Sequence, residues 1–248
     1  MNPIIIKRKS IRKYKDEPFT DGELKAIQSA IDGAKPLYAG INTEASLLTG
    51  EEYRKAVGGL FIVQAPYYIV IKSEQKEGYL VNAGYLGQKI ILRLTEMNIG
   101  TCWLGGAKSK NKQECADGGA EASALSYVIS IALGKPAEKF REDESDASRK
   151  DIEDIASGEI EKHRDVLSAA RLAPSAMNKQ PARYLCAANK IDVFKKKTLL
   201  PMLLNMQVID CGIAIANMIY CDPSYKFGVD PAAEVPQQGW TYIGSLTN

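Results

Sequence analysis

Apolar residues recur every three to four positions in some parts of the chain and run continuously in others. The first pattern predicts helices over 23–31, 82–98 and 158–170, of which the second is apolar enough to be buried and ends at Gly100. Short apolar runs rich in β-branched and aromatic residues predict strands over 65–71, 126–133 and 183–188. The pattern therefore predicts a mixed fold of helices and strands.

The order of predicted elements begins again in the second part of the chain. Residues 31–35 align with 167–171, and residues 82–84 align with 210–212, at similar but unequal spacings of 136 and 128. A duplicated unit predicts two related halves packed about a pseudo-twofold axis, as in a homodimer. Two unrelated amphipathic helices explain the same self-similarity, and the sequence alone leaves both explanations open.

A strongly charged stretch over 138–162 separates the two parts, and we interpret it as a solvated connector. The 248 residues exceed a typical single domain, but two-lobed folds of this length often share one core. We therefore expect a first half over 1–155 and a second, shortened half over 156–248, which together form one unit.

Composition and charge exclude several classes of protein. The chain is 45% hydrophobic and 25% charged, as in globular rather than disordered or fibrous proteins. A net charge of +2 gives no overall field for nucleic acid or an anionic membrane, so any basic site must be local. Because the five cysteines form no CxxC pair and there is one histidine, we expect neither a zinc site nor a disulfide framework.

Apolar runs in the sequence are short. Residues 4–6 are too few for the core of a signal peptide, and no stretch approaches the roughly 18 apolar residues of a membrane span. We therefore expect a cytoplasmic protein that binds small molecules and has no membrane or nucleic-acid partner.

Two segments carry candidate binding chemistry. Residues 8–12 place three cations and a hydroxyl within five positions, which suits a phosphate group. Residues 174–181 form a polar, turn-forming loop between a helical stretch and a strand, where ligand-binding loops commonly lie. Together they predict one cofactor held between two parts of the chain.

Three segments resemble motifs of the FMN-dependent nitroreductase family. They are RKSIRKYKDEP over 8–18, GTCWLGG over 100–106 and APSAMNKQPARY over 173–184. The likeness is to a single-chain form in which two fused halves imitate the usual homodimer. It implies an α+β, three-layer α-β-α fold in two related halves packed as a pseudo-dimer, and a chain that is monomeric because it already mimics the dimer.

The resemblance also implies which residues bind the cofactor. The basic start and a second basic pair would hold the FMN phosphate and ribityl chain, the glycine segment would lie against the flavin near its reactive N5, and the polar loop of the other half would cover the ring. These residues are Arg8, Lys9, Ser10 and Arg12; Arg149 and Lys150; Leu104, Gly105 and Gly106; and Pro174, Ser175, Ala176, Asn178 and Gln180.

The activity implied by the resemblance is ping-pong hydride transfer from NADH or NADPH through FMN to an acceptor such as a nitroaromatic or a quinone. No side chain is expected to break bonds, because the cofactor carries the chemistry. Three alternatives stay open: an FMN-binding protein with little turnover, a flavin-fragmenting or dehalogenase-like chemistry, and a basic-tailed interaction protein with no cofactor.

The chain departs from the family pattern in several places. Residues 35–38 stand where the first half would carry its own polar loop, and the second half lacks both the basic start and the glycine segment, so we expect one complete and one degenerate site. Ala182 replaces the usual Trp after the loop. We interpret His163 as a surface or capping residue and Cys102 as a packing residue.

Overall fold

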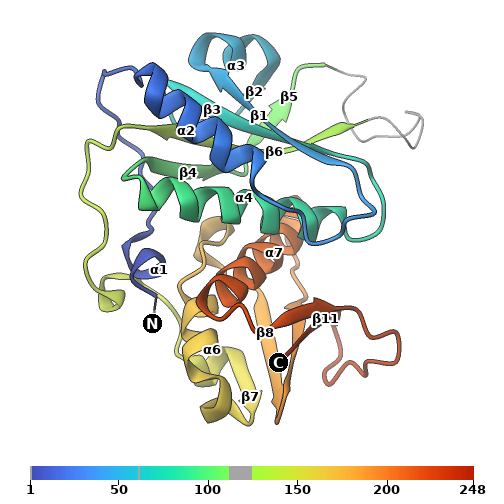
Figure 1. The fold of residues 1–248 in the computed structure, drawn as a ribbon. Helices are drawn as coiled ribbons and strands as arrows, with labels where there is room; N and C mark the ends of the chain where they lie inside the picture. Colours follow the sequence, from blue (N-terminus) through green and yellow to red (C-terminus); the bar gives the residue numbers. More distant parts are fainter. Residues whose placement is uncertain (1, 61, 112–124) are drawn as a thin grey trace.

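Two sheets enclose a layer of helices in the computed structural model, which describes residues 2–60, 62–111 and 125–248 (Figure 1). The first sheet has the strand order β1-β3-β6-β4, and the second has the order β10-β11-β9-β8-β7. All pairings in these two sheets are antiparallel except that of β7 with β8. Their strands are β1 (Thr43–Thr49), β3 (Tyr67–Ser73), β4 (Gly100–Leu104), β6 (Ser126–Gly134), β7 (Ala156–Gly158), β8 (Ala182–Ala187), β9 (Lys190–Lys196), β10 (Lys226–Gly228) and β11 (Trp240–Thr247).

The first sheet is covered on both faces. Alternate residues of β3 point to opposite sides, with Ile69 and Ile71 in the main core and Tyr68 and Val70 in a second hydrophobic cluster. Helices α2 (Asp21–Asp32) and α4 (Tyr79–Glu96) pack on the main-core side. On the other side lie α3 (Gly50–Ala56) and a small sheet formed by β2 (Val57–Gly59) and β5 (Ala107–Ser109).

Helices α6 (Arg164–Arg171) and α7 (Leu204–Cys221) cover the inner face of the second sheet. One hydrophobic cluster runs through both sheets and all four core helices, so the two parts form one unit, as expected. Short elements complete the chain: α1 (Pro3–Lys7), α5 (Ile152–Ile155) and the 3₁₀ turns at Glu144–Asp146, Ile160–His163, Ala176–Asn178 and Pro201–Leu203.

Helices α4 and α7 cross at two glycines. A Cβ on Gly84 would lie 2.2 Å from the carbonyl oxygen of Ile209, and a Cβ on Gly212 would lie 2.1 Å from that of Val81. The contact is reciprocal, because each glycine meets the residue three positions before the other glycine. Such self-complementary contact is the pattern that relates two subunits across a twofold axis.

Strands taken in the same chain order occupy matching places in the two sheets. In the first sheet the order β1-β3-β6-β4 corresponds, strand by strand, to β8-β9-β11-β10 in the second. The ends of α2 and α6 lie 139 residues apart, as do the starts of β1 and β8, so the predicted spacing of 136 is wrong by three residues. This matched order supports the predicted duplication, which stays a prediction together with its boundary at 155.

Most predicted elements exist, with shifted ends. The helix over 23–31 is α2, which begins after a capping box formed by Thr20 and Glu23. The helix over 82–98 is α4, but it ends at Glu96 and the left-handed residue after it is Asn98, with φ 60°. Gly100 instead begins β4, where a Cβ would lie 2.8 Å from a side-chain carbon of Ile11.

The predicted helix over 158–170 is wrong in its first half. That stretch contains the end of β7 and a 3₁₀ turn, and α6 begins only at Arg164. Gly158 has φ 87°, and a Cβ there would lie 2.1 Å from the carbonyl oxygen of Cys186. The glycine therefore allows a close strand contact that a helix start would not provide.

Helix α7 contradicts the expectation that no segment approaches a membrane span. Among the described residues it is one helix of 18 residues whose length and mean hydropathy of 1.3 suffice for a span. However, 61% of it is buried between α4 and the second sheet. Its apolar composition is therefore that of a core helix.

Candidate cofactor site

Two arginines lie near each other with part of their guanidinium groups unpartnered. Arg8 is 2% exposed, and its Nη2 donates to Ser10 Oγ at 3.3 Å. The Nε atoms of Arg8 and Arg149 are buried and have no hydrogen-bond partner in the described part of the chain. Burial, together with the nearby charges of Arg149, Arg141 and Arg12, lowers the pKa of Arg8 to about 9. An unpaired buried charge is costly, so an anion placed against these guanidinium groups would stabilise them.

The basic segment is held by both ends of α1 and by β4. Asn2 Oδ1 caps the helix at the Ile4 N–H, 2.9 Å away, with a proline in the first turn. At the other end, Arg141 donates from Nε to the Ile6 carbonyl at 2.6 Å and from Nη2 to the Ile5 carbonyl at 3.0 Å. Ser10 then forms a parallel bridge with Thr101 of β4. The cations at positions 8–12 therefore have a fixed place along this strand.

The other two cations of the segment are less enclosed. Arg12 is exposed, and its Nη1 reaches the Ser10 carbonyl at 3.5 Å. Lys9 is half-buried and forms no side-chain hydrogen bond or ion pair with any described residue. Both stand at the edge of the cluster rather than within it.

Three hydrogen bonds join the second basic pair and the preceding Ser148 to the polar loop. Arg149 Nη1 donates to Asn178 Oδ1 at 2.9 Å, Asn178 Nδ2 donates to the Ser148 carbonyl at 2.9 Å, and the Lys150 N–H donates to Gln180 Oε1 at 2.8 Å. Arg149 is also close enough to Arg8 for its charge to help lower the pKa of Arg8. The structure therefore brings together the predicted residues at positions 8, 149, 150, 178 and 180.

The polar loop has an unusual backbone. Met177, Asn178 and Gln180 have φ of 50°, 54° and 49°, a region that residues other than glycine seldom adopt. Ser175 Oγ accepts from the Gln180 N–H at 2.9 Å and closes the loop on itself. Strained backbone of this kind persists only where neighbouring contacts impose it, and it is concentrated at functional sites.

One of these contacts comes from Asp210 on α7. Both of its carboxylate oxygens lie 3.1 Å from the Ala176 nitrogen, which donates to them. Asp210 is 6% exposed, and burial raises its pKa to about 8, although the bond from Ala176 acts in the opposite direction. An acid in an apolar helix therefore anchors the loop.

The glycine segment lies at the end of β4 and contacts the first turn of α7. Leu104 is buried at the end of β4, and a Cβ on Gly105 would lie 2.6 Å from Met206 Sδ. A Cβ on Gly106 would lie 2.4 Å from the Leu60 carbonyl oxygen. Because Met206 is one helical turn before Asp210, the first turns of α7 connect this segment with the polar loop.

The basic and glycine parts of the site are separated along β4. Gly105 is four residues beyond Thr101, the bridge partner of Ser10, which corresponds to roughly 13 Å along a strand. The site therefore has a cationic end and, at the other end of one strand, a wall of glycines.

Three residues of this site were not predicted from the sequence. Arg141 and Asp210 anchor α1 and the loop, and Arg171 Nε donates to the Lys150 carbonyl at 2.7 Å. A lone acid within the apolar run VIDCGIAIANM was the available signal for Asp210. Arg141 was hidden in the charged stretch over 138–162, which is not wholly solvated because Arg141 is 8% exposed.

The interpretation of His163 as a surface residue is wrong, although it stands at the N-cap position of α6, without a side-chain capping bond. It is 2% exposed, with Nδ1 2.5 Å from Tyr225 Oη and Nε2 2.7 Å from the Ala187 carbonyl oxygen. It therefore ties α6 to the second sheet. Cys102 is 3% exposed in the smaller hydrophobic cluster, as its predicted packing role requires, whereas Cys115 lies outside the described residues.

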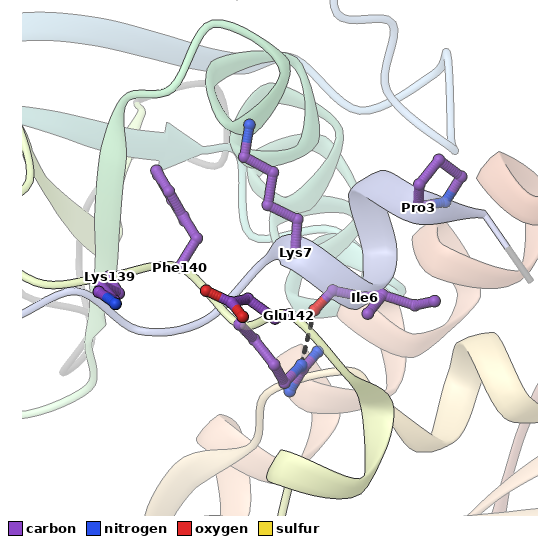
Figure 2. A pocket seen from close by; sticks show the side chains of 7 residues that line it. Pro3, Ile6, Lys7, Lys139, Phe140 and Glu142 are labelled. Atoms are coloured by element: carbon purple, nitrogen blue, oxygen red, sulfur yellow. Dashed lines mark hydrogen bonds between the residues drawn. The ribbon is translucent and has the colours of Figure 1, made fainter.

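Two depressions lie beside the site. An open groove of about 540 Å³ lies on the far side of Arg141, where the Lys7 ammonium sits 5.1 Å from the centre of the Phe140 ring (Figure 2). A much smaller cavity of about 20 Å³ lies under the polar loop, between Ala182, Tyr184 and Asp210. The small residue at position 182 thus leaves room for about one water molecule.

The raised pKa of Asp210 predicts a specific pH dependence of stability. The folded protein keeps a proton that the unfolded chain loses near pH 3.8, so stability falls as pH rises from about 4 to about 8. The slope is about 1.4 kcal/mol per pH unit, or roughly 2–3 kcal/mol between pH 6 and 8. Urea unfolding at several pH values should show this slope in the native protein and not in Asp210→Asn; equal slopes would contradict it.

Comparison with known proteins assigns the chain and its fold to a family. The family described as "Putative TM nitroreductase" matches residues 1–220, and the chain therefore belongs to this nitroreductase family and has its general oxidoreductase role. The fold is similar to that of a putative nitroreductase of Thermotoga maritima, with a TM-score of 0.63 and 17% identity over 99% of this chain and 92% of that one. The predicted family and the α+β nitroreductase-like fold are confirmed.

Shorter nitroreductases match part of the chain. An FMN-dependent nitroreductase of Clostridium difficile is 26% identical, with a TM-score of 0.44 over 60% of this chain and 95% of that one. A putative nitroreductase of Desulfovibrio desulfuricans in complex with FMN is 20% identical, with a TM-score of 0.43 over 62% and 95%. No curated protein matches the sequence.

Proposed function

We propose that this protein is an FMN-dependent oxidoreductase that takes a hydride from NADH or NADPH and passes it to an acceptor such as a nitroaromatic or a quinone. The observation that carries the proposal is the pair of buried, unpartnered Nε atoms of Arg8 and Arg149. Phosphate oxygens satisfy guanidinium groups through charge-assisted hydrogen bonds, so a phosphorylated cofactor fits this end of the site. Membership of the nitroreductase family supports the same choice.

The chain supplies binding, orientation and shielding. FMN, when bound, supplies the hydride chemistry, and the protein's residues place it and limit the access of water. Arg8 and Arg149 would hold the phosphate, and Gly105, where a Cβ would lie 2.6 Å from Met206 Sδ, lets the start of α7 lie close to the end of β4. Met177, which is 69% exposed on the polar loop, offers an apolar surface to the ring or to the acceptor.

The proposed function is tested by counting and reducing flavin. The purified protein should carry about one FMN per chain, identified after release, and anaerobic NADH or NADPH should bleach its visible absorption. Flavin that binds but is not bleached by either donor would leave a flavin-binding protein without this activity. Absence of flavin after reconstitution with excess FMN would overturn the proposal.

We also propose that the chain is a monomer with one working site and one degenerate site. The matched strand orders and the reciprocal glycine contacts support this pairing of halves. At the related position of the other half, Tyr38 takes the place of Met177 and its ring meets Phe227 edge to face, with centroids 5.6 Å apart. An aromatic pair there leaves less room for a flat cofactor. Light scattering should give a mass near 27.1 kDa alongside the single FMN.

A composite site predicts that residues of both halves affect FMN affinity. Asn178→Ala removes the acceptor that orients Arg149 and should weaken FMN binding about tenfold, the effect of one hydrogen bond of about 1.4 kcal/mol. Arg12→Ala, in the other half, should weaken it by a smaller factor, because Arg12 is exposed. Fluorescence titration of flavin-free protein measures both, with the exposed Asn189→Ala as control; a loss in only one of the two would contradict a shared site.

A further inference from the structure

Two side chains at matching places in α4 and α7 hold the two loops of the molecule. Asn82 Oδ1 accepts from the N–H groups of Leu37 at 2.7 Å and Tyr38 at 2.9 Å. Asp210 accepts from the N–H of Ala176, and Leu37 and Ala176 are 139 residues apart, the same spacing that relates the adjoining helices and strands. The same task is therefore performed by a neutral amide in one half and by an acid in the other.

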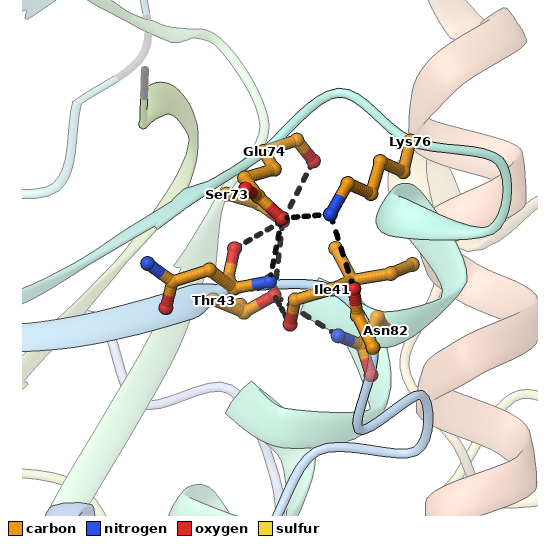
Figure 3. Close-up of polar contacts among 8 residues, drawn as sticks. Ile41, Thr43, Ser73, Glu74, Lys76 and Asn82 are labelled. Carbon is orange, nitrogen blue, oxygen red and sulfur yellow. Dashed lines mark hydrogen bonds and ion pairs between the residues drawn. The ribbon is translucent and has the colours of Figure 1, made fainter. Parts of the chain in front are cut away.

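The neutral member of the pair, Asn82, forms hydrogen bonds through both its amide oxygen and its amide nitrogen. Asn82 Nδ2 donates to Thr43 Oγ1 at 2.9 Å, and this hydroxyl lies 2.9 Å from Ser73 Oγ. Figure 3 shows these side chains converging between β1, β3 and the start of α4. Asn82 is 0% exposed, so its burial is compensated by hydrogen bonds to both ends of its amide.

The acidic member is not compensated in this way. In the described residues the carboxylate of Asp210 accepts from one N–H group only, and it lines the cavity of about 20 Å³ under the polar loop. The groups that face it are Arg171 from α6 and Tyr184 from β8, which line the same cavity, and Cys211 on its own helix. Farther along the sheet, Arg183 and Lys195 lie near Cys211. None of these donates a hydrogen bond to Asp210.

An asparagine would anchor the loop without the cost of burying a charge, as Asn82 does. Anchoring alone therefore does not require an acid, and the property that Asp210 adds is its ability to ionise. We propose that Asp210 is a positioning residue for the polar loop over bound FMN and that its ionisation sets how tightly the loop holds this cofactor. The inference rests on the proposed function, since it assigns to Asp210 a role in the same site.

The direction of the effect follows from charge. The Ala176 N–H has an oxygen acceptor in both ionisation states, so the anchor itself remains when Asp210 ionises. The new negative charge repels an anionic cofactor held by this loop. For two unit charges about 10 Å apart at an effective dielectric constant near 20, the repulsion corresponds to roughly a tenfold loss of affinity. Because burial raises the pKa of Asp210 to about 8, the loss should fall between pH 7 and 9.5. The FMN phosphate is already fully ionised there, as its second pKa is about 6.

The test is the pH dependence of FMN affinity. Flavin-free protein is titrated with FMN at intervals from pH 7 to 9.5, and binding is followed by flavin fluorescence. The native protein should lose about tenfold in affinity over this range. Asp210→Asn should match the native affinity at pH 7, because its amide oxygen keeps the bond to Ala176, and should lose the part of the pH dependence that Asp210 causes. Arg8, whose pKa is about 9, contributes equally to both proteins.

Two further variants separate positioning from ionisation. Asp210→Ala removes the acceptor and should bind FMN about tenfold more weakly than Asp210→Asn at every pH. Asn82→Asp introduces an acid at the matching place in the other half and should keep the native pH profile, provided its far-ultraviolet circular dichroism matches that of the native protein. Other titrating groups also contribute to the pH dependence of FMN affinity in the native protein. They contribute equally in Asp210→Asn, so the difference between the two proteins isolates the contribution of Asp210.

The possible failures are distinguishable. A native protein that binds no FMN at any pH would overturn the proposed function and, with it, the role of Asp210. A native protein that binds FMN while Asp210→Asn keeps the full pH dependence would overturn only the role of ionisation. An affinity of Asp210→Ala equal to that of Asp210→Asn would overturn the positioning role.

Discussion

Replacing Arg8 with methionine is expected to weaken FMN binding at least about 100-fold and, at the same time, to stabilise the flavin-free protein. The loss follows from removing charge-assisted hydrogen bonds to the phosphate, each worth about 1.5–3 kcal/mol. The gain follows because Arg8 is 2% exposed and forms no ion pair with a described residue. Exchange of an uncompensated buried charge for an apolar chain of similar length should add roughly 1–3 kcal/mol.

Flavin titration and urea unfolding of the same flavin-free samples measure the two effects. Arg164→Met is the matched control, because Arg164 is an exposed arginine whose guanidinium pairs with Glu161 and Glu153. It should leave FMN affinity unchanged. If Arg8→Met lowered stability and affinity together, Arg8 would be part of the fold rather than a cation kept for an anion.

Gly84→Ala is expected to destabilise the protein by about 3 kcal/mol or more. In an ordinary helix this substitution is favourable by about 1 kcal/mol. Here the new Cβ would lie 2.2 Å from the Ile209 carbonyl oxygen, so α4 and α7 must separate and loosen the core on both sides of the crossing. Gly212→Ala should have the same effect, since its Cβ would lie 2.1 Å from the Val81 carbonyl oxygen.

Urea unfolding again provides the measurement, with Gly22→Ala as control. Gly22 lies in α2, where the nearest atom to a new Cβ is 4.0 Å away, so this variant should be as stable as the native protein or slightly more so. Native stability in both Gly84→Ala and Gly212→Ala would mean that the two helices are not packed backbone to backbone.

The fold was predictable wherever local pattern and local caps agreed. Helix α2 has both the apolar spacing and the capping box at Thr20, and the sequence predicts it to within two residues. The stretch over 158–170 failed because its first part is shaped by a contact between Gly158 and Cys186, 28 residues away. The sequence around Gly158 does not indicate that Cys186 of β8 approaches it so closely.

The residues of the candidate site also divide into those that local sequence predicts and those that distant contacts determine. Its three segments carry recognisable residue patterns, and the structure joins the basic pair and the polar loop through Arg149 and Asn178. The supporting residues Arg141 and Asp210 act through hydrogen bonds to backbone groups far along the chain. Their identities follow from tertiary packing, so a pattern search could mark Asp210 as unusual without giving it a partner.

The helix crossing at Gly84 and Gly212 also has a consequence at low protein concentration. A site built from two separate subunits is lost on dilution, because dissociation parts its two walls. In the proposed monomer both walls belong to one polypeptide, and the effective concentration of one for the other is set by the intervening chain rather than by the amount of protein present. Occupancy of the site should therefore depend on the ligand alone, even where only a few copies of the protein are made.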